Sequence, residues 1–116
     1  MQENLLIGLS KQFSVKMIKM CSDMNQDKIS TILISQIVRS STSIGANIHE
    51  GNYASSKADF INKFQIALKE CYETSYWLDI MKDSGVVTQE SYVELNGDCC
   101  KLRRMLSASI KTAKNQ

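Results

Sequence analysis

A chain of 116 residues suits one domain, and a domain of this size buries roughly two-thirds of the surface that its unfolded chain exposes. Fourteen basic and 12 acidic residues give a formal charge of +2, and the isoelectric point near 8.3 falls short of the value above about 9 that is typical of nucleic-acid-binding domains. The four cysteines form no C-x-x-C pair and the single histidine has no companion at metal-ligand spacing, so no metal site is expected.

Targeting and membrane segments are also not expected. No stretch approaches the about 20 apolar residues of a membrane span, and the apolar patch Leu5–Leu9 is too short for the core of a signal peptide. The cysteines lie inside helical patterns, which indicates buried or half-buried thiols in a reducing compartment. We therefore expect a single domain over residues 1–116, located in the cytoplasm and without a membrane anchor.

The absence of proline favours long helices. The first predicted helix covers about residues 4–24 and has one apolar face. That face consists of Leu6, Leu9, Phe13, Met17, Met20 and Met24. A polar break follows, and Asp27 is the predicted N-cap of a second helix over about residues 28–50. Gly51 is expected to take the left-handed conformation just past the end of this helix.

The second helix carries a polar stripe beside its apolar stripe. The apolar stripe consists of Ile29, Leu33, Ile37, Ile44 and Ile48. The polar stripe consists of Gln36, Arg39, Ser43, Asn47 and Glu50. Polar groups this close to a helix core either hydrogen-bond a neighbouring helix or contact a partner, and the spacing alone leaves both possibilities open.

The third predicted helix covers about residues 56–84. Ser56, followed by Asp59 three residues later, resembles a capping box, and Gly85 ends the helix. Its core stripe consists of Phe60, Phe64, Ala67, Cys71, Thr74, Leu78 and Met81. The helix is apolar over more of its circumference than one stripe requires, which is typical of a helix that something beyond its own bundle covers.

The excess apolar side chains of the third helix predict an interface between copies of the chain. They are Ile66, Tyr72, Tyr76, Trp77 and Ile80. The alternative is that Trp77 folds back over a neighbouring helix within the monomer, as large aromatic residues at bundle edges often do.

Thr88 is the predicted N-cap of a fourth helix over about residues 89–113. Its core stripe consists of Tyr92, Leu95, Cys99, Leu102, Leu106, Ile110 and Ala113. Short connections force successive helices to run antiparallel, so the sequence predicts an all-α, antiparallel up-down-up-down four-helix bundle.

The chemical groups of the chain do not form an enzyme site. Glu70 and Glu73 lie near lysines on one helix, and a face of mixed charge is ordinarily solvated and paired within the helix. A ferritin-like di-iron site needs Glu-x-x-His pairs, which His49 alone cannot supply. Gly45 lies inside a helix without the further glycine and Gly-Lys-Ser/Thr of a phosphate loop. We expect no catalytic residues, no cofactor and no small-molecule substrate.

Two basic groupings could contact a partner. Lys101, Arg104 and Lys111 lie opposite the apolar stripe of the fourth helix, where they would attract phosphate in a salt-dependent way. The alternative there is an ordinary solvated face. The second grouping is Arg39 and Lys57, which flank the Gly51 turn. Its hydrogen-bonding neighbours Ser43, Asn47 and Glu50 make it the better candidate for a specific contact.

The run from Gln36 to Gly51, followed by Ser56–Ile61, resembles the bacterial "four helix bundle protein" family. The match continues through Ile66–Glu70, Tyr76–Leu78 and the Gly85 stop, and extends over about residues 4–113. Founding members of this family are encoded inside intervening sequences of large-subunit ribosomal RNA genes and were labelled ribosomal proteins. A relative is the accessory protein of diversity-generating retroelements, a basic pentamer that works with a reverse transcriptase and nucleic acid.

The resemblance implies an antiparallel four-helix bundle, a ring-like homopentamer and no assigned reaction. The recurrent residues of the family map to Arg39, Ser43, Asn47, Glu50, Gly51 and Glu73. Glu90, Glu94 and Asp98 on the fourth helix depart from the strongly basic relatives. Two main hypotheses follow: a self-assembling bundle that binds RNA or a ribonucleoprotein, and a structural or protein-binding scaffold without a nucleic-acid role. A third is an enzyme, for which the sequence offers only scattered carboxylates such as Glu50 and Glu73.

Overall fold

The chain folds into four long helices. The computed structural model describes residues 2–116, and side chains from residue 5 onward. The helices are α1 (Gln2–Ser22), α2 (Lys28–Gly51), α3 (Lys57–Asp83) and α4 (Gln89–Lys114), and the described residues contain no strand. The molecule measures 47 × 21 × 19 Å. The predicted all-α class is confirmed.

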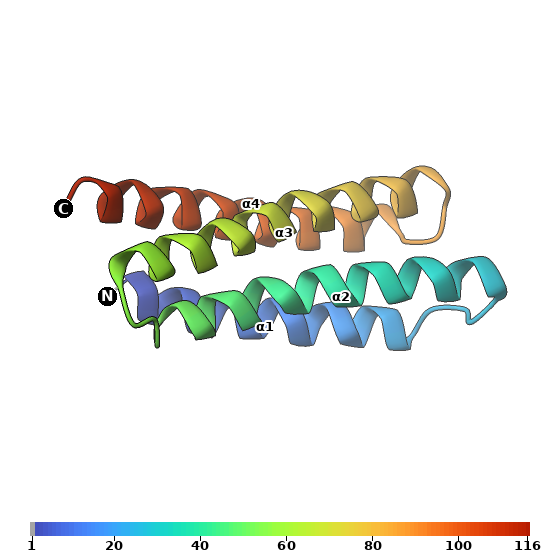
Figure 1. The fold of residues 1–116 in the computed structure, drawn as a ribbon. Coiled ribbons are helices and arrows are strands. Elements are labelled where there is room, and N and C mark those ends of the chain that lie inside the picture. The colour runs from blue at the N-terminus through green and yellow to red at the C-terminus, as the bar shows by residue number, and fades with distance from the viewer. Residues whose placement is uncertain (1) are drawn as a thin grey trace.

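Each helix packs against two neighbours, so that α1 contacts α2 and α4, and α3 contacts α2 and α4. Figure 1 shows that successive helices run in opposite directions and that the N- and C-terminal ends lie at the same end of the bundle. The predicted up-down-up-down arrangement is therefore confirmed. None of the helices in the described part of the chain is both long enough and apolar enough to cross a membrane.

Three side chains begin the helices as the sequence predicts. Each accepts a hydrogen bond from the backbone N–H three residues later, which satisfies one of the unpaired donors of the first turn. The pairs are Asp27 with Ser30 (2.8 Å), Ser56 with Asp59 (3.1 Å) and Thr88 with Ser91 (3.1 Å).

The helix ends match the sequence less closely. The first helix ends at Ser22 instead of Met24, because the backbone N–H of Met24 donates to the carbonyl of Cys21 in a tighter turn (3.2 Å). Gly85 has a φ of +77° just after α3, as predicted, and the N–H of Val86 bonds the carbonyl of Met81 (2.8 Å) in the pattern of a Schellman cap.

The prediction for Gly51 is wrong. Gly51 is the last residue of α2, and Asn52 caps that helix with an ordinary φ of −71°. A Cβ atom at Gly51 would lie 2.7 Å from Cε1 of Phe64. Glycine is therefore needed here because α3 approaches α2 closely, and not because the backbone is left-handed.

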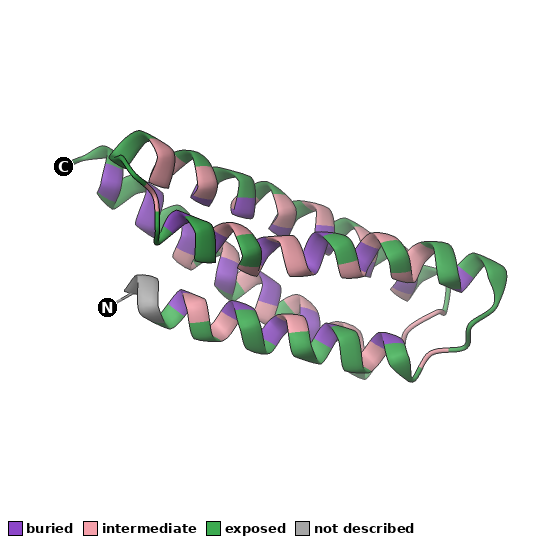
Figure 2. Cartoon of the chain, turned by 60° about the horizontal axis from the view of Figure 1, so that its bottom comes forward, coloured by how far each residue is buried: buried purple, intermediate pink, exposed green. Residues whose placement is uncertain are grey.

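The core follows the predicted stripes, of which Ile29 is the one exposed member. Figure 2 shows the buried residues along the inner sides of the helices. The stripes of α3 and α4 are buried apart from the half-buried Phe60 and Tyr92. Ile29 is 65% exposed because it lies in the first turn of α2, whereas Ser40 and Ser41, which sequence periodicity leaves out, are fully buried.

The cysteines are free thiols. Cys21, Cys71 and Cys99 are buried and Cys100 is half-buried, as predicted. The thiol of Cys99 donates to the carbonyl of Cys71 (3.3 Å), and the hydroxyl of Ser75 lies 3.5 Å from the sulfur of Cys99. Burial raises the pKa of Cys21 to about 11. This thiol therefore stays protonated near neutral pH.

Candidate functional site

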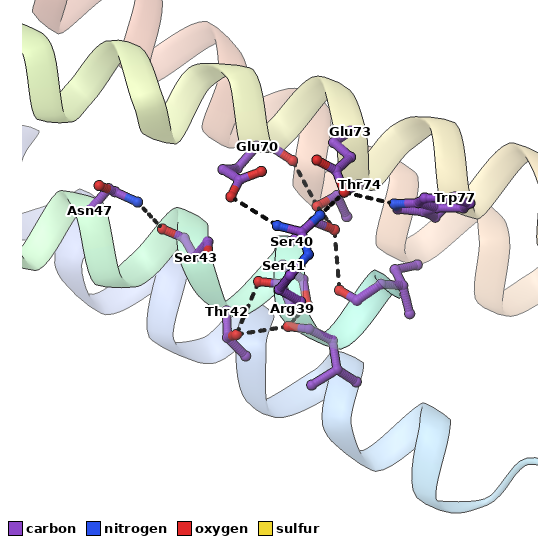
Figure 3. A network of polar contacts seen from close by, with 12 residues as sticks. Arg39, Ser40, Ser41, Thr42, Ser43, Asn47, Glu70, Glu73, Thr74 and Trp77 are labelled. Atoms are coloured by element: carbon purple, nitrogen blue, oxygen red, sulfur yellow. Dashed lines mark hydrogen bonds and ion pairs between the residues drawn. The ribbon is translucent and has the colours of Figure 1, made fainter. Parts of the chain in front are cut away.

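The predicted polar stripe of α2 faces α3. Arg39 forms ion pairs with Glu70 (Nη1 to Oε2, 3.4 Å) and with Glu73, and both carboxylates belong to α3. The indole N–H of Trp77 donates to the same oxygen of Glu73 (3.0 Å). Figure 3 shows these side chains converging from the two helices. Glu70 and Glu73 are thus paired across the helix interface, and not within their own helix as predicted.

Small hydroxyl groups fill the interface beneath this ion pair. Thr74 Oγ1 hydrogen-bonds the hydroxyl of Ser40 (2.9 Å) and the backbone oxygen of Glu70 (2.8 Å). Ser40 and Thr74 are both fully buried. Because their hydroxyl groups have partners, this polar contact between α2 and α3 avoids the cost of an unsatisfied buried group.

Asn47 and Glu50 of the polar stripe also have partners in the chain. The side-chain amide of Asn47 donates to the backbone oxygen of Ser43 (2.9 Å), and Glu50 pairs with Lys63 of α3 (3.2 Å). Of the two possibilities that the sequence leaves open, contact with a neighbouring helix therefore applies to Arg39 and Glu50. Contact of these residues with a partner molecule stays a prediction.

The charge balance argues against the Arg39 network as a phosphate site. One guanidinium faces two carboxylates, of which Glu70 is only 16% exposed at its side chain. Lys57, the predicted companion of Arg39, does not join it. Lys57 lies at the start of α3, at the end of the bundle, and donates to the backbone oxygen of Gln116. The two cations thus belong to separate places in the fold.

The cations of α4 are differently placed. Lys101, Arg104 and Lys111 are exposed, and no ion pair joins any of them to another described residue. Glu94 and Asp98 of the same helix instead bind Lys16 of α1 (3.0 and 2.9 Å). The hydrogen bonds that Lys16 donates to Asp98 and, with a smaller effect, to Glu94 raise the pKa of Lys16. These two acids are therefore engaged at the α1–α4 contact.

The predicted interface of α3 divides into two groups. Tyr72 and Tyr76 are 58% and 59% exposed, and Ile66 is 37% exposed. Trp77 is half-buried, packs against the core and meets the Tyr76 ring edge-on at 5.2 Å. Ile80 is also half-buried. Trp77 therefore does pack within the monomer, as the alternative expected, while the exposed tyrosines stay candidates for a contact between copies.

Sequence reasoning missed an exposed apolar surface on α1 and α2. Val15 and Ile18 are 43% and 45% exposed, and Ile29 and Ile32 are 65% and 56% exposed. A groove of about 260 Å³ runs between the same helices. Its lining includes Ile7, Val15, Thr42, Ala46 and His49. The i, i+3 spacing of each exposed pair is a signal for this surface, but Ile29 also fits the predicted core stripe of the second helix.

The described residues contain no group of three or more histidine, cysteine, aspartate or glutamate side chains that could hold a metal ion. His49 is exposed, and its ring lies 5.2 Å from that of Tyr53.

Known proteins give independent information about the chain. A sequence model of the 23S rRNA-intervening sequence protein family matches residues 2–108. No curated protein shows significant similarity. The fold is similar to the crystal structure of a protein of unknown function from the S23 ribosomal protein family of Bacteroides thetaiotaomicron, with 39% sequence identity and a TM-score of 0.91. That similarity covers 96% of this chain and 99% of the other. The resemblance seen in the sequence is thus confirmed, and the chain belongs to the 23S rRNA-intervening sequence protein family.

Proposed function

We propose that this chain is a non-enzymatic helical module that self-associates and binds RNA or a ribonucleoprotein partner. The observation that carries the proposal is the cationic face of α4, formed by Lys101, Arg104 and Lys111. The three- and seven-residue spacings from Arg104 align these side chains along one side of the helix. Unpaired cations in such a row attract the phosphates of a nucleic acid and release its counterions.

Two further observations support this assignment. The acids of α4 that would oppose it, Glu94 and Asp98, are engaged by Lys16. The family description refers to ribosomal RNA, and the S23 family of the similar structure is described as ribosomal. Arg39 contributes differently, because its two carboxylate partners make it a residue that holds α2 against α3.

A binding experiment with a charge-matched control tests the RNA contact. Fluorescence anisotropy with a structured RNA would compare the wild type with a Lys101→Gln, Arg104→Gln, Lys111→Gln variant. The control variant is Lys11→Gln, Lys19→Gln, Lys28→Gln, which removes the same charge from exposed residues of α1 and α2. Each lost phosphate contact reduces the magnitude of the slope of log K against log salt concentration by about 0.7 to 0.9. Loss of three contacts in the α4 variant should therefore reduce the magnitude of that slope by about 2 to 3.

The outcomes separate two functions. Weak binding by the α4 variant with normal binding by the control supports the α4 contact. An equal loss in both variants would mean that only net charge matters, and would count against a defined RNA surface. Failure of the wild type to bind RNA would favour the second candidate, a protein-binding scaffold, for which the small net charge of +2 and the exposed apolar residues of α1 and α2 are the motivating observations.

A further inference from the structure

A groove of about 580 Å³ lies at one end of the bundle. It is bordered by the turn between α2 and α3 and by the last turns of α4, which Figure 1 shows at the same end of the molecule. Most of its polar lining is uncharged. The residues that matter here are Asn52, Ser56, Lys57, Phe60, Ser109 and Thr112.

Ser109 gives this groove an unused hydrogen-bonding group. The residue is 5% exposed, and its hydroxyl oxygen is the one buried side-chain polar atom of the described residues that has no hydrogen-bond partner. An unsatisfied buried hydroxyl is costly, so such groups in folded proteins ordinarily have a partner. A ligand in the groove would supply one.

The start of α3 gives the groove its positive character. Ser56 caps the helix and satisfies the N–H of Asp59, while the N–H groups of Lys57 and Ala58 have no partner within the helix. The positive end of the dipole of this 27-residue helix lies at the same place. Asp59, the acidic residue of the first turn, does not line the groove.

Lys57 is the only charged side chain among the described residues that line the groove. Its ammonium group reaches the backbone oxygen of Gln116, which also belongs to the lining. A phosphate oxygen bound in the groove would take the place of the Gln116 oxygen at this ammonium group. Phe60, half-buried beside Phe64, adds an aromatic wall.

We propose that this end groove binds the phosphate group of a nucleotide, with Lys57, the first turn of α3 and the hydroxyl of Ser109 as its ligands. A compact anion fits a single cation next to unpaired N–H donors, and the Phe60 ring offers a surface for the attached base. The phosphate can come from the 5′ end of an RNA chain or from a free mononucleotide. For RNA, the inference rests on the proposed function.

An NMR titration of the whole chain tests the site with four probes: inorganic phosphate, adenosine 5′-monophosphate, a short RNA carrying a 5′-phosphate and the same RNA with a 5′-hydroxyl group. Backbone amide signals of Ser56, Lys57 and Ser109 should shift. Lys57→Gln should weaken binding of the phosphorylated probe at least tenfold, and Ser109→Ala should weaken it several-fold. Lys69→Gln, an exposed lysine on the same helix, should leave it unchanged.

The outcomes distinguish the ligand sources and the two proposals. Stronger binding of the phosphorylated RNA than of its 5′-hydroxyl form assigns the groove to RNA ends, whereas tightest binding of the mononucleotide assigns it to free nucleotides. The inference would be overturned if none of the probes shifted these amide signals, or if Lys57→Gln bound the phosphorylated probe as tightly as the wild type. If 5′-hydroxyl RNA still binds through Lys101, Arg104 and Lys111, the proposed function survives that failure.

Discussion

The fold gives Arg39 a different role from the one that its position on the helix predicts. On a helical wheel it belongs to a polar stripe that is open to any partner, whereas in the fold it joins two carboxylates of α3. Its side chain is 49% exposed, so solvent screens the pairs and their net contribution to stability is about 1 kcal/mol or less. The main role of the network is therefore to fix the position of α2 relative to α3, because its contribution to the free energy of unfolding is small.

Gly51 and Gly97 both lie in helices, but the space around them differs. A Cβ atom at Gly51 would lie 2.7 Å from Phe64, so Gly51→Ala should lower the free energy of unfolding by about 1 to 3 kcal/mol through overpacking. Gly97 has open space around it, and Gly97→Ala should raise that free energy by about 1 kcal/mol through helix propensity. Urea denaturation measures both, and a stabilised Gly51→Ala variant would contradict the close approach of α3.

Tyr92 makes stability depend on pH in the alkaline range. Its hydroxyl donates to Asp79 (2.7 Å), and this bond, with burial, raises the pKa of Tyr92 to about 12. The unfolded chain loses the same proton near pH 10. Between about pH 10 and 12 the folded state therefore holds more protons, and its stability falls as pH rises.

The effect can be isolated with Tyr92→Phe. The difference in unfolding free energy between wild type and variant should be constant below about pH 10 and should shrink towards pH 12. Denaturation at several pH values measures it, with absorbance at 295 nm following the phenol itself. Tyr53→Phe, an exposed ring without a side-chain hydrogen bond, is the control. A difference that does not vary with pH would mean that the Asp79 bond is absent in solution.

At the scale of the helices, the sequence predicts the features that depend only on residues close together along the chain, namely the helix starts and the core stripes. Capping by Asp27, Ser56 and Thr88 needs only a side chain and an N–H three residues away, so the helix starts follow from local chemistry. The core stripes follow from the 3.6-residue period, which points apolar side chains to one face. Periodicity and capping therefore suffice for the four-helix bundle.

Features that depend on a second helix were not predictable in this way. The pairing of Glu50 with Lys63 and the contact of Gly51 with Phe64 both require the register between α2 and α3. The end groove is a further case, because Lys57 and Ser109 are distant in sequence and line the same groove only when α4 packs beside α3. The one feature of the sequence that points to this groove is Ser109, a serine next to the core stripe of α4.

At the scale of the whole molecule, charge placement matters more than net charge. The total of +2 is small, yet Lys101, Arg104 and Lys111 lie on one helix without paired acids among the described residues. Two of the acids of α4 are paired with Lys16 at another contact. A nearly balanced chain can therefore present one cationic side, and the isoelectric point alone underestimates its attraction for phosphate.

Two exposed apolar surfaces lie on different helices, so a variant of each tests the proposed contact between copies of the chain. We expect the native mass spectrum to show five times the 13.1 kDa monomer, as the family resemblance implies, and Tyr76→Glu on α3 to lower that mass. Burying a carboxylate at an interface without a partner is strongly unfavourable. Trp77→Ala is a poorer probe, because Trp77 packs against its own core and would also destabilise the monomer.

Ile32→Glu on α2 is the matched variant, since Ile32 is 56% exposed and Tyr76 is 59% exposed. If Tyr76→Glu yields monomers while Ile32→Glu keeps the wild-type mass, α3 provides the interface that its excess apolar residues predict. The reverse result would transfer the interface to α1 and α2, and a wild-type monomer would contradict self-association altogether. Circular dichroism of each variant shows whether the helices persist, so that a lower mass reports a lost contact between copies and not an unfolded chain.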